Sequence, residues 1–273
     1  MSSELGKRVL TGALGAVLVL ALLIFGNWVI VFLLVTGLSL GLVHEYTEMT
    51  LTLPDRQEKK YAFLAVAWLV AGADLLIPQS EHLLLILCFL VFFGYFLFTA
   101  SRHYSAALTQ HFRELALSIF GLIYLVFLPL YFRKIYELPH GLEWVLVFLL
   151  INWAGDTGAY FAGMHYGKIK LYPQMSPKKT REGAWGGLLA GAVTVIAFKY
   201  AFFPSLSLGV ALFLSIFVGA VAQVGDLCES FLKRSFQLKD SGSILPGHGG
   251  LLDRFDGVVF SLPVMYAGIR IFI

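Results

Sequence analysis

The sequence is poor in charge and in cysteine. Only 14% of its 273 residues are Asp, Glu, Lys or Arg, whereas soluble domains usually carry about 25%. Apolar residues make up 58%, so the composition argues against a water-soluble domain and indicates a membrane protein. The two cysteines are Cys88, in an apolar run, and Cys228, beside a polar segment. We expect them at different membrane depths and therefore not in a disulfide.

Several sequence signatures are also missing. Lys7 and Arg8 precede an apolar stretch, but no small-residue cleavage site follows, which indicates an uncleaved span instead of a signal peptide. There is no Walker Gly-x-x-x-x-Gly-Lys-Ser/Thr motif and no Cys/His spacing typical of zinc. The net charge of +3 gives no indication of a nucleic-acid partner.

Long apolar runs fill most of the chain. A helix needs about 20 apolar residues to cross a bilayer, and open strands are too costly in lipid. We therefore expect an all-α, polytopic transmembrane helix bundle of about nine spans: Val9–Phe25, Trp28–Val43, Tyr61–Ile77, His82–Ala100, Leu115–Phe132, Leu142–Gly163, Ala184–Phe203, Leu206–Gly225 and Val258–Ile273. The simplest interpretation is one integral membrane domain over 1–273. In it 1–141 are mainly scaffold spans, 142–257 carry the chemistry, and 258–273 form the last span.

The basic residues indicate the orientation of these spans. With nine spans, sixteen of the 20 lysines and arginines fall in one set of alternate loops, and only Arg133, Lys134, Lys199 and Arg270 fall in the other. Cytoplasmic loops carry the excess of Lys and Arg. The N-terminus is therefore expected in the cytoplasm and the C-terminus outside, with two polar cytoplasmic loops at Met164–Gly183 and Asp226–Gly257.

Asp156 stands in an otherwise apolar predicted span. A charge at the centre of a membrane helix costs about 2.5–3.5 kcal/mol on insertion scales. It therefore needs a partner, a water-filled cavity or a metal. We favour a ligand or positioning role for Asp156 over a structural carboxylate that is capped by a nearby Lys or Arg.

A basic segment, Ser176–Gly183, follows. Ser176 before Pro177 predicts a helix start, because Ser caps helices and Pro fits the first turn. Free N–H groups at such a start attract phosphate, and Lys178, Lys179 and Thr180 add charge and a hydroxyl. The segment suits a triphosphate, although an ordinary positively charged cytoplasmic loop is the alternative.

The richest segment is Gln223–Gly257. Apolar spacing predicts that the eighth span continues as a helix beyond the membrane, where Glu229 and Lys233, four residues apart, are expected to pair on its surface. Gly247, Gly249 and Gly250 permit close backbone approach to phosphate. Three carboxylates accompany them, and hard oxygen ligands with phosphates suit Mg²⁺, with salt bridges as the alternative: Asp226, Asp253 and Asp256.

These residues resemble a known family. Ser230-Phe-Leu-Lys233-Arg234, then Lys239-Asp240, then Pro246-Gly-His248-Gly-Gly-Leu-Leu-Asp253-Arg254-Phe-Asp256 resembles the C-terminal signature of phosphatidate cytidylyltransferases, with Asp156-Thr157 and Ser176-Pro-Lys-Lys-Thr180 in the expected order upstream. The resemblance covers about Asn152 to Gly257. It implies that CTP and phosphatidate react to give CDP-diacylglycerol and pyrophosphate, with Mg²⁺, K⁺ as a second cation, and a homodimer. The compact single-domain form favours a prokaryotic inner membrane.

The implied mechanism assigns roles to these residues. Asp226 and Asp253 are expected to bind Mg²⁺, with Asp256 as a third ligand or support. Asp156 is expected to be a supporting carboxylate, with a second cation as its candidate partner. CTP is assigned to Ser176, Lys178, Lys179, Thr180, Lys239, Gly249 and Gly250. Lys233, Arg234, His248 and Arg254, with Lys239, are expected to neutralise phosphatidate or pyrophosphate. The alternatives are a CTP-dependent lipid (polyprenol) kinase and an ion-coupled transporter.

Overall fold

The computed structural model describes residues 15, 17–77, 81–100, 108–244 and 249–272, and nearly all of its regular structure is helical. Residues 17–25 are helical, and the further elements are α2 (Trp28–Thr50), α3 (Arg56–Leu76), α4 (Glu81–Ala100), α5 (Leu108–Leu122), the π-helical turn η2 (Ile123–Phe127), α6 (Leu128–Tyr136), α7 (Gly141–Tyr166), β1 (Lys170–Tyr172), β2 (Ser176–Thr180), α8 (Arg181–Phe202), α9 (Leu208–Ser235) and α10 (Leu252–Phe272). The expected all-α class is confirmed, with one small β-hairpin added.

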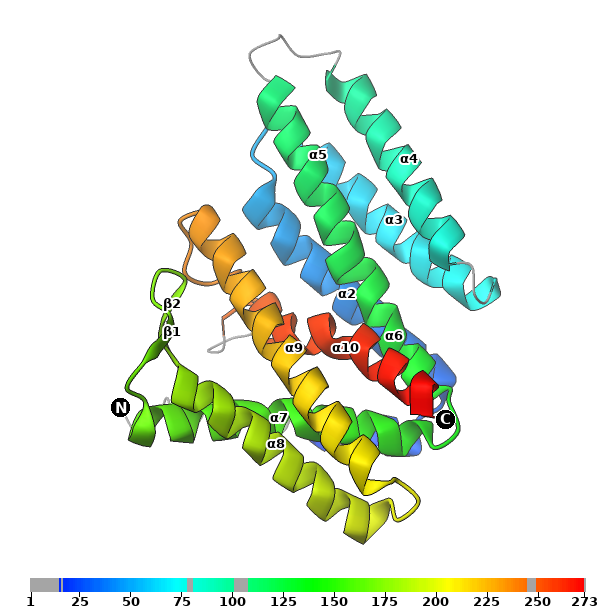
Figure 1. Ribbon diagram of the computed structural model, residues 1–273. Helices are drawn as coiled ribbons and strands as arrows, with labels where there is room; N and C mark the ends of the chain where they lie inside the picture. Colours follow the sequence, from blue (N-terminus) through cyan, green and yellow to red (C-terminus); the bar gives the residue numbers. More distant parts are fainter. Residues whose placement is uncertain (1–14, 16, 78–80, 101–107, 245–248, 273) are drawn as a thin grey trace.

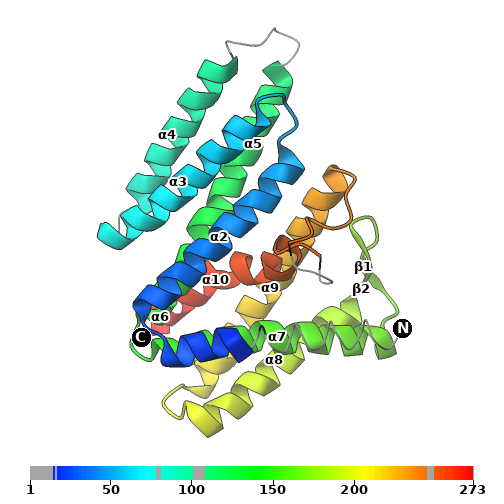
Figure 2. The same ribbon diagram turned by 180° about the vertical axis from the view of Figure 1, so that it is seen from behind.

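The helices form two groups (Figures 1 and 2). Helices α2 to α5 lie together, and α7 and α8 run side by side at a steep angle to them, while α9 and α10 lie between. One buried apolar cluster joins α2–α5 to the end of α9 and the start of α10. A second joins α7, α8 and α9 to the beginning of α2 and the end of α10. Because both clusters include α9 and α10, these two helices tie the groups together.

Within the described residues, seven helices are long and apolar enough to cross a membrane: Trp28–Thr50, Glu81–Ala100, Leu108–Tyr136, Gly141–Tyr166, Arg181–Phe202, Leu208–Ser235 and Leu252–Phe272. They match an α-helical polytopic membrane protein. Of the first predicted span, Val9–Phe25, the structure describes residues 15 and 17–25, and 17–25 are helical.

The third predicted span is a helix, α3, but its charges keep it out of this set of seven. Its buried Lys59 pairs with Glu114 of α5 at 2.8 Å, and its buried Asp74 pairs with Arg133 of α6. Ion pairs to neighbouring helices thus let α3 carry charges that a lone membrane helix would hold only at high cost.

The helices on either side of the predicted loop Asp226–Gly257 extend into it. Helix α9 runs on to Ser235, as its apolar spacing predicted, but α10 begins at Leu252, six residues before the expected last span. Half of the predicted loop Asp226–Gly257 is therefore helical, and residues 236–251 connect the two helices. Asp253 and Asp256 consequently lie in the first turns of a helix.

The predicted helix start at Ser176 is wrong. Ser176–Thr180 forms β2, which pairs antiparallel with β1, and α8 begins five residues later. Pro177 is tolerated because a two-stranded hairpin leaves the outer side of each strand without a partner. Thr180 is the N-cap, and its Oγ1 accepts the N–H of Gly183 at 3.1 Å. The N–H groups expected for phosphate are therefore partly used by the chain itself.

Glycines allow α7 and α8 to approach closely. A Cβ on Gly158 of α7 would meet the Cβ of Ala190 and lie 2.8 Å from the carbonyl oxygen of Gly186, and a Cβ on Gly187 would lie 2.8 Å from the carbonyl oxygen of Gly155. Small residues at such contacts are typical of membrane helix pairs. The close packing fixes α7, with Asp156, against the helix that follows the hairpin.

Candidate active site

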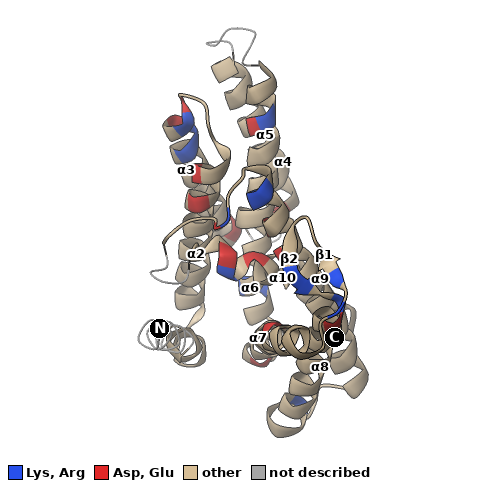
Figure 3. Ribbon diagram, turned by 90° about the vertical axis from the view of Figure 1, so that its left-hand side faces the viewer, with Lys and Arg blue, Asp and Glu red and all other residues tan. Residues whose placement is uncertain are grey.

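A cavity of about 560 Å³ lies between α7, α8, α9, the start of α10 and hairpin β1–β2. One end is charged, because Lys178 and Lys179 of β2 line it. Figure 3 shows basic residues in blue along the hairpin. The other end is lined by small and apolar residues of three helices, among them Ile151, Gly191, Ser215 and Gly219. The cavity thus joins a polar, ionic region to an apolar one between membrane helices.

Eight of the predicted site residues line this cavity: Asp156, Lys178, Lys179, Thr180, Asp226, Asp253, Arg254 and Asp256. They come from α7, β2, α9 and α10, and the sequence separates the first from the last by a hundred residues. Asp226 interacts electrostatically with both Asp156 and Asp256. The four predicted aspartates thus line one cavity, and their role there stays a prediction.

Lys179 and Asp226 form an ion pair across the cavity, from β2 to α9. Both side chains keep access to the cavity, since the lysine is 28% and the aspartate 39% exposed. This pair joins the segment expected to hold a triphosphate to a residue expected to hold a metal. Each side chain of the pair is therefore accessible to an ion of opposite charge that enters the cavity.

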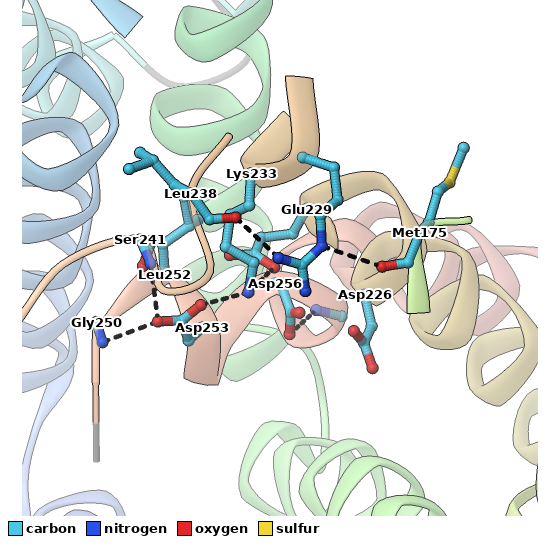
Figure 4. A network of polar contacts seen from close by, with 12 residues as sticks. Met175, Asp226, Glu229, Lys233, Leu238, Ser241, Gly250, Leu252, Asp253 and Asp256 are labelled. Atoms are coloured by element: carbon cyan, nitrogen blue, oxygen red, sulfur yellow. Dashed lines mark hydrogen bonds and ion pairs between the residues drawn. The ribbon is translucent and has the colours of Figure 1, made fainter. Parts of the chain in front are cut away.

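Asp253 is more fully engaged, as Figure 4 shows. Its Oδ1 lies 2.5 Å from Lys233 Nζ, and its Oδ2 accepts the N–H groups of Ser241 at 3.0 Å and Gly250 at 2.9 Å. In the figure its carboxylate turns toward these donors, whereas Asp226 lies on the far side of Asp256. Asp253 therefore organises the segment before α10 as well as lining the cavity.

Lys233 also pairs with Glu229, one turn earlier on α9, at 2.7 Å. The sequence suggested that this pair lies on the surface, which is wrong, because the Glu229 side chain is 0% exposed. The interpretation failed because spacing along a helix predicts which residues pair but not which neighbour covers them. Lys233 thus neutralises two carboxylates behind the cavity.

The other predicted residues that the structure describes do not line the cavity. Arg234 donates to the carbonyl oxygens of Met175 at 3.4 Å and Leu238 at 3.0 Å, and so links the hairpin to the end of α9. Ser176 is on β2, and Lys239 is exposed in the connection after α9. His248 lies outside the described residues.

The glycine-rich turn is only partly available to a phosphate. Gly249 has a φ of 84°, in the left-handed region that favours glycine. The N–H of Gly250, however, already binds Asp253. The turn as described therefore positions Asp253 instead of presenting both glycine N–H groups.

Sequence reasoning missed several polar residues at the site. Tyr124, in the π-helical turn η2, donates its hydroxyl to the carbonyl oxygen of Asp256 at 3.0 Å, and π-turns are frequent at functional sites. Gln223 lines the cavity and donates to the carbonyl oxygen of Ala184 at 3.0 Å. Asn152 lines it as well. Their one sequence signal is a polar side chain in an apolar span.

The carboxylates of this cavity supply hard oxygen ligands. Among the described residues, no three or more His, Cys, Asp or Glu side chains are gathered as a ready-made metal site. Mg²⁺ does not need one, because it usually binds one or two carboxylates and completes its shell with water and phosphate oxygens. The arrangement is suited to neutralising and aligning phosphorylated molecules, with acids and bases facing one another across the cavity.

A family model matches nearly the whole chain, and known proteins resemble about half of it. Residues 6–272 match the family model described as Cytidylyltransferase family. A protein of Bacillus subtilis (strain 168) named phosphatidate cytidylyltransferase is 39% identical over 165 residues, which are 60% of this chain and 61% of that protein.

Two staphylococcal proteins with the same name are also similar. The protein of Staphylococcus saprophyticus is 42% identical over 147 residues, 54% of this chain and 56% of its own length. The protein of Staphylococcus haemolyticus is 46% identical over 125 residues, 46% of this chain and 48% of its own length. The chain thus aligns with about half to three fifths of each of these relatives.

Proposed function

The chain belongs to the cytidylyltransferase family, and from this premise we propose that it is a phosphatidate cytidylyltransferase, which transfers CMP from CTP to phosphatidate and releases pyrophosphate. One observation supports this most directly: basic residues of β2 and aspartates of α7, α9 and α10 line one cavity that continues between membrane helices. Its ionic end suits phosphates, and its apolar end suits the hydrocarbon part of a lipid.

The reaction needs little acid–base chemistry. A phosphate oxygen of phosphatidate, ionised near neutral pH, forms a bond to the α-phosphorus of CTP. The bond from that phosphorus to the oxygen bridging to the β-phosphate breaks, and pyrophosphate leaves. Because both reactants are anions, positioning and charge neutralisation by the protein dominate catalysis.

The basic residues receive the phosphates in this proposal. Lys178, Lys179 and Thr180 line the cavity from the hairpin and hold the triphosphate. Arg254, which lines it from α10, neutralises phosphatidate or the departing pyrophosphate. Lys233 and Arg234 do not line the cavity. Lys233 pairs with the carboxylate of Asp253, and Arg234 donates to the backbone carbonyl oxygen of Met175.

Asp226 and Asp253 are the proposed Mg²⁺ residues, with Asp256 in support. A bound Mg²⁺ supplies positive charge to phosphate oxygens. Lys179, which lines the cavity, pairs with Asp226, and it would be available to a phosphate if Asp226 held a cation. Lys233 pairs with Asp253 and also with the buried Glu229. Asp156 would support a second cation, for which K⁺ is our proposal.

The finer membrane arrangement is also proposed. We infer nine spans, with the N-terminus in the cytoplasm, the C-terminus outside, and the cavity opening at the cytoplasmic face of a prokaryotic inner membrane. Its support is the excess of Lys and Arg on one side, where CTP is available. The proposed assembly is a homodimer.

A labelling experiment tests the reaction. Purified protein receives phosphatidate and CTP labelled at either the α- or the γ-phosphate, with Mg²⁺ or with EDTA. We expect the α-label in the lipid product, the γ-label in pyrophosphate, and loss of turnover in EDTA. Transfer of the γ-label to a lipid would show a kinase, and ion flux without nucleotide turnover would show a transporter; either result rejects the proposal.

A further inference from the structure

Glu45 is a buried carboxylate that the proposed reaction does not use. It lies in α2, in the first half of the chain, and is 3% exposed. The predicted span ended at Val43, but α2 continues to Thr50 and so carries Glu45 into the interior. A carboxylate is rarely buried in a membrane protein without a specific role, because its desolvation is costly.

Among the described residues, the hydrogen bonds that this carboxylate accepts come from Ser241, Ile244 and the first residue of α10. Oε2 accepts the N–H of Leu252 at 2.9 Å and the hydroxyl of Ser241 at 3.3 Å. Oε1 lies 3.4 Å from the N–H of Ile244. Leu252 is the first residue of α10, so the negative charge also lies at the positive end of that helix.

The segment before α10 is packed directly against Glu45. A Cβ on Gly242 would overlap Oε1, and a Cβ on Gly250 would lie 2.8 Å from Oε2. Neither position has room for a larger residue while Glu45 stays where it is. The fit therefore depends on backbone approaching the carboxylate, which glycine allows.

The same segment is bound on its other side by Asp253. Ser241 donates its N–H to Asp253 and its hydroxyl to Glu45. Gly250 donates its N–H to Asp253 and packs against Glu45. The ends of the segment are thus held between two carboxylates, one from α2 and one from α10, and only the second lines the cavity.

We propose that Glu45 is a positioning residue for the transfer site: it does not line the cavity, and it fixes Ser241–Ile244 and the first turn of α10, which together set the direction of Asp253. The inference rests on the proposed function for its link to catalysis. Its structural part, the fixing of the segment, stands apart from that function and is measured separately.

The test compares four variants of the full chain in lipid nanodiscs. Glu45→Gln keeps the length of the side chain and removes its charge, Glu45→Asp keeps the charge and shortens the reach, and Glu45→Ala removes both. The matched control is Glu48→Gln, on the same helix, because Glu48 pairs with Lys60 of α3. Amide hydrogen exchange and steady-state kinetics are measured for each.

For Glu45→Gln we expect amide exchange at Ile244 and Leu252 to speed up by about tenfold or more, which corresponds to roughly 1.4 kcal/mol. We expect kcat to fall at least tenfold, with the KM for CTP within about threefold of the original, because CTP is held from the hairpin. Glu45→Asp should recover part of the loss, and Glu48→Gln should change neither measurement.

Two results would overturn the inference. One is unchanged exchange in the segment in Glu45→Gln. The other is faster exchange spread evenly over all helices, which would mean a general loss of stability. If the original chain does not transfer CMP at all, the proposed function fails, while the exchange measurement still decides whether Glu45 fixes the segment.

Discussion

Two lysine–aspartate pairs carry most of the electrostatic organisation of the cavity. Lys179 reaches Asp226 from the hairpin, and Lys233 reaches Asp253 within the α9–α10 unit. In each pair, a lysine that the sequence assigned to a phosphate forms an ion pair with an aspartate that it assigned to a cation. The two pairs differ in access, because Lys233 and Asp253 are 12% and 11% exposed and are held by further contacts, whereas the first pair is open to the cavity.

Lys179→Ala tests the hairpin pair. A hydrogen bond to a charged group contributes about 1.5–3 kcal/mol, so we expect the KM for CTP to rise roughly 10- to 100-fold and the KM for phosphatidate to change much less. The control is Lys170→Ala, a lysine of the same hairpin that is exposed on β1. The measurement is steady-state kinetics with each substrate varied in turn. An equal or larger rise in the KM for phosphatidate would contradict the placement of the triphosphate.

At the scale of helices and strands, close packing and buried ion pairs hold the site in place. The glycines of α7 and α8 let Asp156 and the hairpin approach each other, because the hairpin joins the ends of these two helices. Helix α3 is held by Lys59 and Asp74, which pair with α5 and α6. Helices α5 and α6 flank η2, and Tyr124 of η2 donates a hydrogen bond to the backbone of α10. The ion pairs of α3 are thus connected to the site through α5, η2 and α6.

Gly158→Ala tests the α7–α8 contact. The added Cβ meets Ala190 and the backbone of Gly186, and overpacking costs about 1–3 kcal/mol. We therefore expect Tm to fall by several degrees and activity to fall with it. Gly94→Ala is the control, since a Cβ there meets nothing within 4 Å. Thermal unfolding in detergent gives the Tm of both variants. Equal Tm values would contradict the close approach of α7 and α8.

Asp74→Asn tests the ion pair between α3 and α6. Removing one partner of a buried pair leaves Arg133 without full compensation, which costs about 3–5 kcal/mol. We expect a clear loss of Tm in this variant. Glu143→Gln, a partly exposed carboxylate of α7, should leave Tm nearly unchanged. A stable Asp74→Asn variant would mean that Arg133 finds its compensation elsewhere.

Over the whole molecule, charge separates the two ends of the bundle. The hairpin and the ends of α3 and α5 carry many of the basic residues (Figure 3). At the opposite end, Arg133 and Lys134 are matched by Asp74, Glu81 and Glu137. This distribution agrees with the proposed orientation, in which the cavity faces the cytoplasm.

Cysteine labelling tests that orientation. In a background with Cys88→Ser and Cys228→Ser, Gln237→Cys marks the end of α9 and Ser205→Cys marks the turn between α8 and α9, and both sites are exposed. A thiol reagent that does not cross membranes should label the Ser205→Cys variant in intact cells and the Gln237→Cys variant only in inverted vesicles. The reverse pattern would reject the proposed topology.

Local sequence determined a large part of this protein. Apolar runs fixed the existence of most helices, because a backbone in lipid has to satisfy its hydrogen bonds within the helix. The motifs of the second half identified eight residues that line one cavity. The boundaries were less certain, as Ser176 shows, because strand pairing with β1 outweighs a local helix-start signal.

Only the tertiary structure decided which neighbour each charge meets. Glu229 is buried although its spacing suited a surface pair, and Asp253 is bound by Lys233, Ser241 and Gly250. Glu45 meets Ser241 across 196 positions of sequence. Helix formation depends on residues three or four apart, whereas the burial and pairing of a carboxylate depend on which helices pack together. No local pattern in one sequence contains that information.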